Sequence, residues 1–250
     1  AYAHSQGRDT IASGYTAHAE GRNTIAGGDT SHAEGFGSTA SGYYSHAENF
    51  LTTSSGDDSH AEGHGTIASG HASHTQGVNT IASGDYSHAQ GSHVRALGLY
   101  SHAGGKGFSF DLTVPFTPTH TIVASGATSF VHYTQTAPGG YIGAYGNYSA
   151  ILGGTNHNIN TGATSSIILG GNGGSISGGI VRSAVIGGNA ITAIADDTVY
   201  MPDVVIDGLV SVTDLQTNID GLIIDGASDI SLKTNITELE TPLDKIKKLR

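Results

Sequence analysis

The stretch SHAEGHGTIASGHA, residues 59–72, is one unit of the repeat that decides the fold of this chain. A glycine recurs every fourteen residues from Gly14 to Gly98, and a histidine keeps the same interval without interruption. Self-similarity at a fixed short period is the signature of a solenoid, in which each repeat forms one coil that stacks on its neighbour. We therefore predict an all-β fold, a parallel β-roll or β-helix solenoid. The histidine column consists of His4, His18, His32, His46, His60, His74, His88 and His102.

Two short runs of residues, each closed by a glycine turn, predict two β-strands per coil. Because successive side chains of a strand point to opposite faces, His and Glu share one face of the first strand while Ser and Ala share the other. In the second strand, Thr and Ala lie opposite Ile and Ser. We expect the small residues to fill a narrow interior between two closely spaced sheets. The alanines of this interior are Ala12, Ala19, Ala26, Ala33, Ala40, Ala47, Ala61, Ala68 and Ala82.

Composition restricts the classes of partner. The 250 residues carry a formal net charge of −11, and Lys and Arg cluster only at the C-terminal end, so no basic stripe is present to neutralise nucleic-acid phosphates. The chain has no Cys, which excludes disulfides and thiol chemistry. We find neither a signal peptide nor an apolar run long enough to span a membrane. The first residues already lie inside a repeat, so we expect the chain to be part of a longer protein.

The predicted coil exposes two faces, one with His and Glu and the other with Ile and Ser. A thin roll with both faces uncovered is expected to associate, most simply as a homotrimer around an axis parallel to the stack. The isoleucine column is interrupted by Thr39, Thr53 and Arg95, whereas the histidine column has no exception. We therefore place the histidine column against the partner chains, at the trimer axis. Its expected hydrogen-bond partners are Glu20, Glu34, Glu48 and Glu62.

Beyond His102 the column is predicted to continue with aromatic side chains. Phe116 and Phe130 follow at steps of fourteen residues, and Ala124 and Gly126 keep their own columns in phase. Replacement of His by Phe is more compatible with a buried column than with a solvated one. Both phenylalanines are therefore assigned to the trimer axis.

The histidine column admits three chemical roles. A polar ladder, with His hydrogen-bonded to Glu and Gln, would fix the register between chains, and we favour this interpretation. Three imidazoles at each level of a trimer could instead bind a transition metal ion, with all eight histidines as candidate ligands. Charging many stacked imidazoles at once would cause repulsion, so the column could also act as a pH switch. We predict that the protein uses no cofactor.

Residues 1–105 resemble the left-handed parallel β-roll heads of trimeric autotransporter adhesins. That family also runs on fourteen-residue coils, with an S-x-A-x-G strand followed by an A-x-G strand. The resemblance implies a trimeric β-roll. This chain carries His and Glu where the adhesins usually carry aliphatic residues, so the polarity of their interface is not transferred to it.

A different repeat, with a step of seventeen residues, occupies residues 141–195. Its continuous apolar runs predict strands that are buried on both faces, in wider coils that continue the stack. Residues 106–140 are predicted to form degenerate coils and a transition loop, and residues 196–227 a β stem. The apolar runs of the repeat lie within residues 149–154, 166–171 and 183–188.

Residues 228–250 carry a second specific signal. They open with SDISLKTNI, and the motif LDKI follows at 243–246, after a Thr-Pro pair that predicts the start of a short helix. This combination resembles the opening of the endosialidase-type intramolecular chaperone, found at the C-terminus of phage tail spikes and fibres. The resemblance implies a chaperone that drives trimerisation and then cleaves the chain between Ala227 and Ser228, with Ser228 as nucleophile and Lys233 assisting. Because the match covers only the truncated start of that domain, we expect the pair to be inactive here.

The two resemblances, in the order shaft then chaperone, imply a segment of a homotrimeric phage-like tail fibre or spike, located on the virion and extracellular. We expect it to have a structural and receptor-binding function, with a host-surface glycan or protein as receptor and other virion or tail proteins as partners. A trimeric adhesin on a bacterial cell surface is the alternative. A polysaccharide depolymerase has less support, because no paired-carboxylate motif stands out. We predict no enzyme activity beyond a single self-cleavage.

Overall fold

The computed structural model describes residues 2–107, 122–134 and 142–202, all within one compact unit, Ala1–Val204. These residues form β-strands and no helix, so none of them belongs to a helix that is long and apolar enough to cross a membrane. Phe116 lies outside the described residues, as does the predicted stem beyond residue 202. Residues 228–250, with Ser228, Lys233 and the predicted short helix, also lie outside them.

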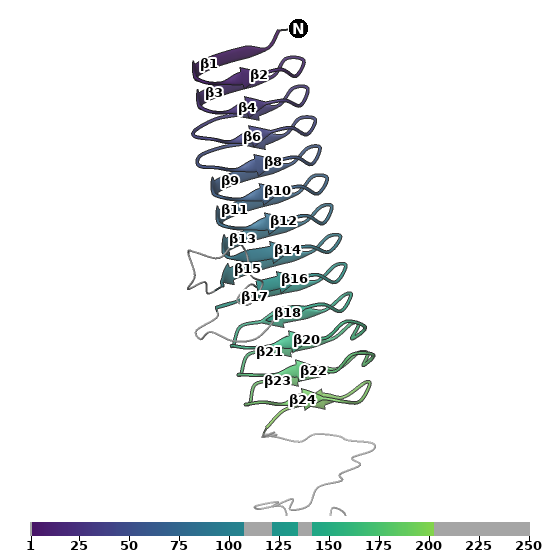
Figure 1. The fold of residues 1–250 in the computed structure, drawn as a ribbon. Coiled ribbons are helices and arrows are strands. Elements are labelled where there is room, and N and C mark those ends of the chain that lie inside the picture. The colour runs from purple at the N-terminus through teal and green to yellow at the C-terminus, as the bar shows by residue number, and fades with distance from the viewer. Residues whose placement is uncertain (1, 108–121, 135–141, 203–250) are drawn as a thin grey trace, which may run out of the picture. The chain divides into compact units, whose positions relative to one another are not determined.

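The strands alternate between two parallel sheets, because each coil adds one strand to each sheet (Figure 1). Over the described ranges the first sheet has 13 strands and the second has 12. The first sheet contains β1 (His4–Arg8), β3 (His18–Arg22), β5 (His32–Ala33), β7 (His46–Ala47), β9 (His60–His64), β11 (His74–Val78), β13 (His88–Ser92), β15 (His102–Lys106), β17 (Phe130–Thr134), β19 (Ala150–Leu152), β21 (Ile167–Leu169), β23 (Ala184–Ile186) and β25 (Val199–Tyr200). The second sheet contains β2 (Ile11–Ala12), β4 (Ile25–Ala26), β6 (Thr39–Ala40), β8 (Thr53–Ser54), β10 (Ile67–Ala68), β12 (Ile81–Ala82), β14 (Val94–Ala96), β16 (Ile122–Ala124), β18 (Ile142–Ala144), β20 (Asn158–Ile159), β22 (Ser175–Ile176) and β24 (Thr192–Ala193). The predicted all-β parallel solenoid is confirmed.

The register between coils follows the period of the sequence. His4 of β1 pairs with His18 of β3, fourteen residues later. In the second repeat, Ile151 of β19 pairs with Ile168 of β21, seventeen residues later. The predictions of two strands per coil, and of a stack that continues through both repeats, are therefore confirmed.

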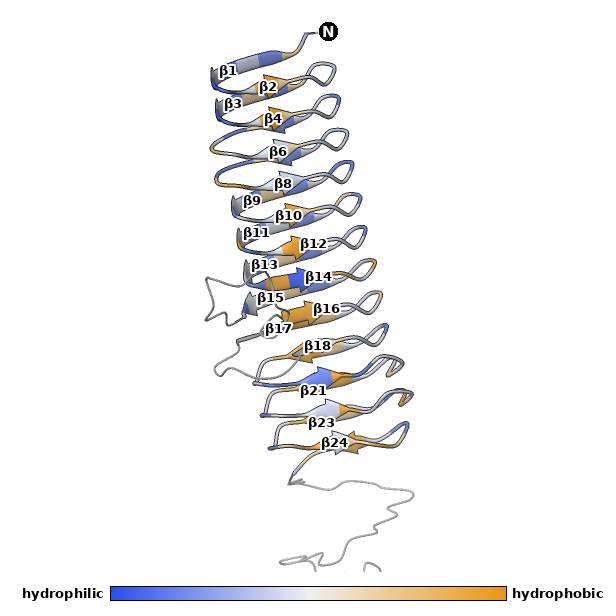
Figure 2. Cartoon of the chain, in the orientation of Figure 1, coloured by the Kyte–Doolittle hydropathy of each residue, from blue (hydrophilic) through white to orange (hydrophobic). Residues whose placement is uncertain are grey.

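Small side chains fill the interior of the fourteen-residue coils. Thr24, Ser31 and Ala33 are at most 1% exposed, whereas Ile25 is 39% exposed and His32 is half-buried on the outside. Figure 2 shows the outward isoleucines as orange segments of the second sheet, for example in β4 and β10. The alternation along each strand thus confirms the predicted narrow interior between two sheets.

The glycines from Gly14 to Gly98 lie at a turn where the backbones of successive coils touch. A Cβ atom added to Gly28 would lie 1.9 Å from the carbonyl oxygen of Gly42 in the next coil. Real Cβ atoms do not approach a carbonyl oxygen so closely, so this turn excludes every residue with a side chain. The glycine column therefore sets how tightly the coils stack.

The transition between the two repeats is a single step of the stack. His102 of β15 pairs directly with Phe130 of β17, although 28 residues separate them. In the second sheet, Ala96 of β14 likewise pairs directly with Ala124 of β16. Counting by fourteen residues would predict two coils between these strands. The paired strands show that they are neighbours in the sheet.

The interior widens beyond this transition. Ile122, Ile159 and Ile176 are fully buried at interior positions where the first repeat mostly has Ala, Ser or Thr. The seventeen-residue coils also pair outside the two sheets, for example through a bridge between Thr164 and Val181. Large apolar side chains thus fill the interior of the seventeen-residue coils, and the change begins before them, at Val94 and Ile122.

The prediction that the apolar runs of the second repeat are buried on both faces is wrong for the described chain. Ile151 and Val185 are fully buried, but their neighbours Leu152 and Ile186 are 41% and 37% exposed. The reason is that a coil has one interior, so alternate side chains of a strand must point out of it. An apolar row therefore remains on the outer face of the first sheet.

Candidate functional site

The candidate site is the histidine column, which lies on the outer face of the first sheet. Successive ring centroids are 4.8–5.0 Å apart, which is the spacing of paired strands. From His18 to His88 the rings stack, with interplanar angles of 1–6°. At the two ends the order changes, because His4 is tilted by 31° and His102 is perpendicular to its neighbour. The parallel register therefore converts a sequence period into a continuous stack of imidazoles.

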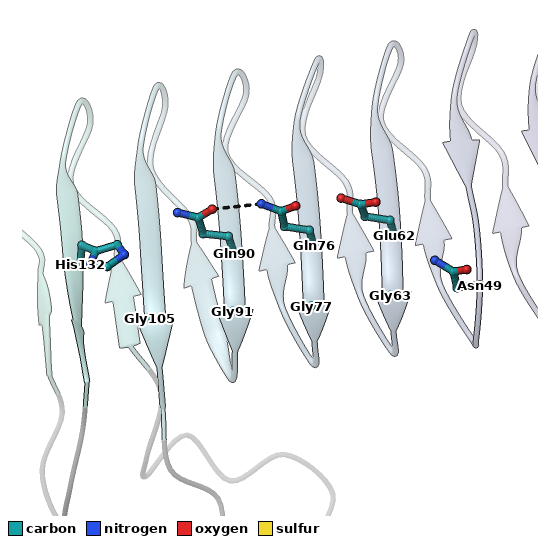
Figure 3. A pocket seen from close by; sticks show the side chains of 9 residues that line it. All are labelled: Asn49, Glu62, Gly63, Gln76, Gly77, Gln90, Gly91, Gly105 and His132. Carbon is teal, nitrogen blue, oxygen red and sulfur yellow. Dashed lines mark hydrogen bonds between the residues drawn. The ribbon is translucent and has the colours of Figure 1, made fainter.

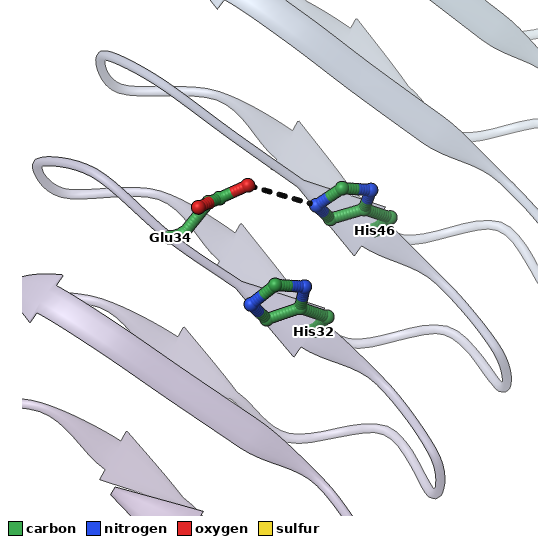
Figure 4. A group of neighbouring side chains, drawn as sticks. All are labelled: His32, Glu34 and His46. Carbon is green, nitrogen blue, oxygen red and sulfur yellow. Dashed lines mark ion pairs between the residues drawn. The ribbon is translucent and has the colours of Figure 1, made fainter. Parts of the chain in front are cut away.

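Glutamates from one coil approach the histidine of the following coil. In Figure 4 the carboxylate of Glu34 points toward His46 and away from His32, which belongs to its own coil. Three successive coils repeat this contact between Oε1 and Nε2. The pairs are Glu34–His46 at 3.4 Å, Glu48–His60 at 3.1 Å and Glu62–His74 at 3.5 Å.

The predicted hydrogen bonds from the column to four glutamates are confirmed in part. Glu48 and His60 have the geometry of a hydrogen bond. Glu34 and Glu62 lie at ion-pair distance from the following histidine without that alignment. Glu20 instead lies 3.9 Å from His18 of its own coil. The carboxylates thus lie beside the histidine column, but they provide a hydrogen bond only to His60.

Several imidazole Nε2 atoms are buried and lack a hydrogen-bond partner within the described part of the chain. Leaving a buried polar atom unsatisfied costs about 1–3 kcal/mol, and here the cost recurs from coil to coil. A single chain therefore presents a column whose hydrogen-bonding capacity is unused. The atoms belong to His18, His32, His46, His74 and His88.

Burial lowers the pKa of four histidines in the later part of the column, His46, His74, His88 and His102. Desolvation, together with repulsion from His60 and His32, lowers the pKa of His46 below its ordinary value. Desolvation, followed by repulsion from His102 and His74, lowers the pKa of His88 to about 4. Both shifts favour the neutral imidazole, and at His88 they make protonation unfavourable near neutral pH.

The row of side chains beside the histidines changes from glutamate to glutamine along the stack, and the histidine column itself then becomes apolar. The positions held by glutamate in earlier coils are taken by Gln76 and Gln90, and the Gln76 side-chain amide donates a hydrogen bond of 3.0 Å to Gln90. His102 then stacks on Phe130 with ring centroids 4.9 Å apart. Phe130 thus continues the column as predicted. The next positions of the column are Ala150, Ile167 and Ala184.

A groove of about 580 Å³ runs beside the column, along the glutamate and glutamine row (Figure 3). Three of its glycines, Gly63, Gly77 and Gly91, cannot carry side chains, because a Cβ on each would lie 2.0–2.2 Å from a carbonyl oxygen of the next coil. Its polar groups are carboxylate, amide and imidazole, which accept and donate hydrogen bonds. The lining residues are Asn49, Glu62, Gly63, Gln76, Gly77, Gln90, Gly91, Gly105 and His132.

The sequence period predicted one column of histidines that continues in Phe130, but a second aromatic stack was not predicted. The rings of Phe36 and Phe50 are 5.2 Å apart, and those of Phe50 and His64 are 4.8 Å apart. The guanidinium group of Arg22 lies 5.3 Å from the ring of Phe36. These four residues also follow one another at fourteen-residue intervals, so the period could have revealed them.

No protein-family model matches this sequence, and no curated protein matches it either. The fold is compatible with a fibrous structural protein, because coil after coil presents the same outer face. The two features of this face that bear on function are the histidine column and the exposed apolar residues that follow it along the first sheet.

Proposed function

We propose that this chain is a structural and receptor-binding segment of a homotrimeric, phage-like tail fibre or spike, with the histidine column along the threefold axis. The observation that carries this proposal is the uninterrupted column of imidazoles, five of which have a buried Nε2 atom without a partner in the described residues. Copies of one chain share the same coil spacing, so each level of a partner meets an equivalent level. Carboxylates and amides of the partners would then satisfy the atoms that one chain leaves unpaired.

The apolar continuation of the same face supports this assembly. His132 of β17 is followed in register by Leu152, Leu169 and Ile186, so the polar row ends in a hydrophobic one. Leu152 and Ile186 are exposed in the single chain. Contiguous exposed apolar residues usually mark an interaction surface. A threefold axis on this face would cover the polar and the apolar rows together.

In this role the segment belongs to the virion and is extracellular. Its outward surfaces would meet a glycan or protein receptor on the host envelope, and other virion or tail proteins would flank it. The chaperone start at residues 228–250 would assist trimerisation during assembly. We propose no catalytic activity apart from self-cleavage at Ala227–Ser228 in the complete protein.

A bacterial cell-surface adhesin is the second candidate, and the fourteen-residue coils favour it specifically, since adhesin heads use the same period. A depolymerase is disfavoured by the contacts of the carboxylates. Glu34, Glu48 and Glu62 lie beside histidines on the stacked column rather than opposite one another across the groove.

Two substitutions in the same coil test the position of the axis. His60 lies on the histidine column, and Ile67 lies on the outer face of the second sheet with 37% exposure. We expect native mass spectrometry to show a threefold mass for the wild type and for Ile67→Arg, and a single-chain mass for His60→Arg. Circular dichroism of each variant controls for loss of the β fold.

Two outcomes of this experiment contradict the proposal. A monomeric wild type would exclude the trimer, and a trimer lost only in Ile67→Arg would place the isoleucine face at the axis. The location is tested separately with gold-labelled antibodies against residues 2–107. Labelling of viral tails supports the fibre, whereas labelling confined to bacterial envelopes supports the adhesin.

A further inference from the structure

Two overlapping groups of potential metal ligands lie on the histidine column. In each group, one candidate ligand atom per residue lies within 4.8 Å of the others. All five residues come from the outer face of the first sheet, where consecutive coils bring them into register. The groups are His32, Glu34 and His46, and then His46, Glu48 and His60.

The spacing within these groups matches metal coordination at two of the three ligands. Zinc binds imidazole nitrogen and carboxylate oxygen at about 2.0–2.2 Å, so two ligands of a tetrahedral ion lie about 3.3 Å apart. Glu34 Oε1 and His46 Nε2 are 3.4 Å apart, and Glu48 Oε1 and His60 Nε2 are 3.1 Å apart. The two imidazoles of each group are stacked 4.8 Å apart with their planes within 6° of parallel, so their lone pairs do not point at a common ion. The remaining histidine must therefore rotate out of the stack as well as move closer, by up to about 1.5 Å on the same geometry.

The ligand atoms are available for coordination. The Nε2 atoms of His32 and His46 have no hydrogen-bond partner in the described residues, so their lone pairs are unused. The Nε2 atom of His46 is buried, but the side chains of Glu34 and His46 are each 33% exposed, so rotation of the imidazole would bring this atom to an ion. Their strands are fixed in the parallel sheet, which limits the ordering cost to the side chains.

We propose that Glu34 and His46 with His32, or Glu48 and His60 with His46, bind one divalent transition metal ion per chain. Two imidazoles and one carboxylate form a ligand set that suits Zn²⁺, Co²⁺ or Ni²⁺, with water in the open positions. His46 belongs to both groups, and its Nε2 carries a single lone pair. The two groups therefore share one ligand, and only one of them can bind an ion at a time. All ligand atoms belong to one chain, so the site does not need the proposed trimer. In a trimer, the ion would take the place of a partner's carboxylate or amide at the Nε2 atom of His46.

The sequence of the column provides a matched control. His88 lies between two histidines of the column, as His46 does, but it stacks only on His74, because the ring of His102 is perpendicular to it. The residue at the glutamate position of its own and the preceding coil is glutamine. A neutral amide is a poor ligand for these ions compared with a carboxylate. His88 therefore has the histidine environment of the site without its carboxylates.

The test uses untagged, chelator-washed protein that is dialysed against Zn²⁺ at pH 7.5 and analysed for bound metal. We expect one ion per chain in the wild type and in His88→Asn, and a loss of at least tenfold in affinity in His46→Asn. The double variant Glu34→Gln with Glu48→Gln keeps all eight histidines and should lose affinity similarly. Co²⁺ should give the visible absorption of a tetrahedral ion with the variants that bind Zn²⁺, the wild type and His88→Asn. It should give none with the variants that lose Zn²⁺.

Several outcomes would overturn this inference. They are no stoichiometric ion in the wild type, equal losses in His46→Asn and His88→Asn, or a stoichiometry of one ion per three chains, which indicates a site shared between chains. Native mass measured on the same samples separates this result from the proposed function. A trimer without metal contradicts only the metal site, and a monomer that binds one ion contradicts only the trimer.

Discussion

The fourteen-residue coils of residues 2–107 and the wider coils of residues 142–202, which contain the seventeen-residue repeat, share the same two sheets but differ in what they bury. The first bury Ala, Ser and Thr, as at Ala33 and Thr24, and the second bury Ile and Val, as at Ile168. Full burial of an Ile side chain contributes about 1.5–3 kcal/mol, which Ala cannot match. Close backbone packing at the glycine turn therefore recurs throughout the narrow coils and extends to Gly146 at the start of the wide coils, which otherwise depend on side-chain burial.

The largest expected contrast concerns glycine at the turns of the two regions. A Cβ on Gly70 would lie 2.1 Å from the carbonyl oxygen of Gly84, whereas Gly170 has a φ of +64° and nothing within 4 Å of such an atom. We expect Gly70→Ala to lower the free energy of unfolding by more than about 4 kcal/mol, because backbone must move. Gly170→Ala should cost only about 1–2 kcal/mol, the cost of a left-handed alanine. Urea denaturation compares the two, and equal losses would contradict tighter stacking in the narrow coils.

The interiors should respond in opposite directions to a change of side-chain volume. Ile168→Ala leaves a cavity in a wide coil and should cost about 2–5 kcal/mol. Ala47→Val overfills a narrow coil, where Ala47 is fully buried, and should cost about 1–3 kcal/mol. Thermal unfolding followed by circular dichroism measures both. If Ala47→Val raised the midpoint of unfolding, the narrow interior would have spare room and the comparison would fail.

Acid should destabilise the narrow coils through the histidine column. The pKa of His88 is lowered in the folded chain to about 4 from an ordinary value of 6.5, so the unfolded state binds the proton more tightly. The contribution of His88 is fully present above pH 6.5 and is lost as the pH falls through about 4. We expect the midpoint of thermal unfolding to fall between pH 7 and pH 4, and to fall less in His88→Phe, which copies the stacking of Phe130.

The matched control for this acid effect is His71→Phe, which changes a histidine at the turn edge, outside the column. That variant should keep the pH dependence of the wild type. If His88→Phe and the wild type lost the same stability over this pH range, the column would not be the source of the effect.

The smallest expected effect is on the charge pair of the wide coils. Arg182 donates hydrogen bonds to both carboxylate oxygens of Asp197, and this pairing lowers the pKa of Asp197. Both side chains are about 60% exposed, so solvent screens their attraction. We expect Asp197→Asn to leave the unfolding midpoint unchanged within error in a calorimetric scan. A clear loss would show that exposed charges contribute more to the wide coils than burial indicates.

The sequence predicted the features of the fold that follow from period and from alternation. The parallel register of His4 with His18 and the burial of Ala33 both result from these two rules. The exposure of Leu152 was not predicted, because a continuous apolar run has no alternation to show which residues point inward. The direction of Glu34 toward His46 was not predicted either, because it depends on side-chain rotamers between neighbouring coils.

Counting residues also failed at the transition. Phe130 was correctly placed in the histidine column, but it pairs directly with His102, without the intermediate level that counting by fourteen predicted. Phe116, which was assigned to that level, lies outside the described residues. An insertion whose length equals one period leaves every later column in phase, so the sequence cannot distinguish it from a coil. Which strands pair directly therefore cannot be predicted from the period alone.

The glycine contacts at the turn have a consequence for how this chain can change in evolution. Because every coil from Gly14 to Gly98 meets its neighbour through the same backbone approach, the first repeat is a lattice in one dimension whose unit is fourteen residues. Duplication or deletion of a whole unit restores every contact, whereas any other insertion must be accommodated outside the stack. The length of the stack can therefore vary by recombination within a gene, in steps of about 4.8 Å, without any new interior having to be selected.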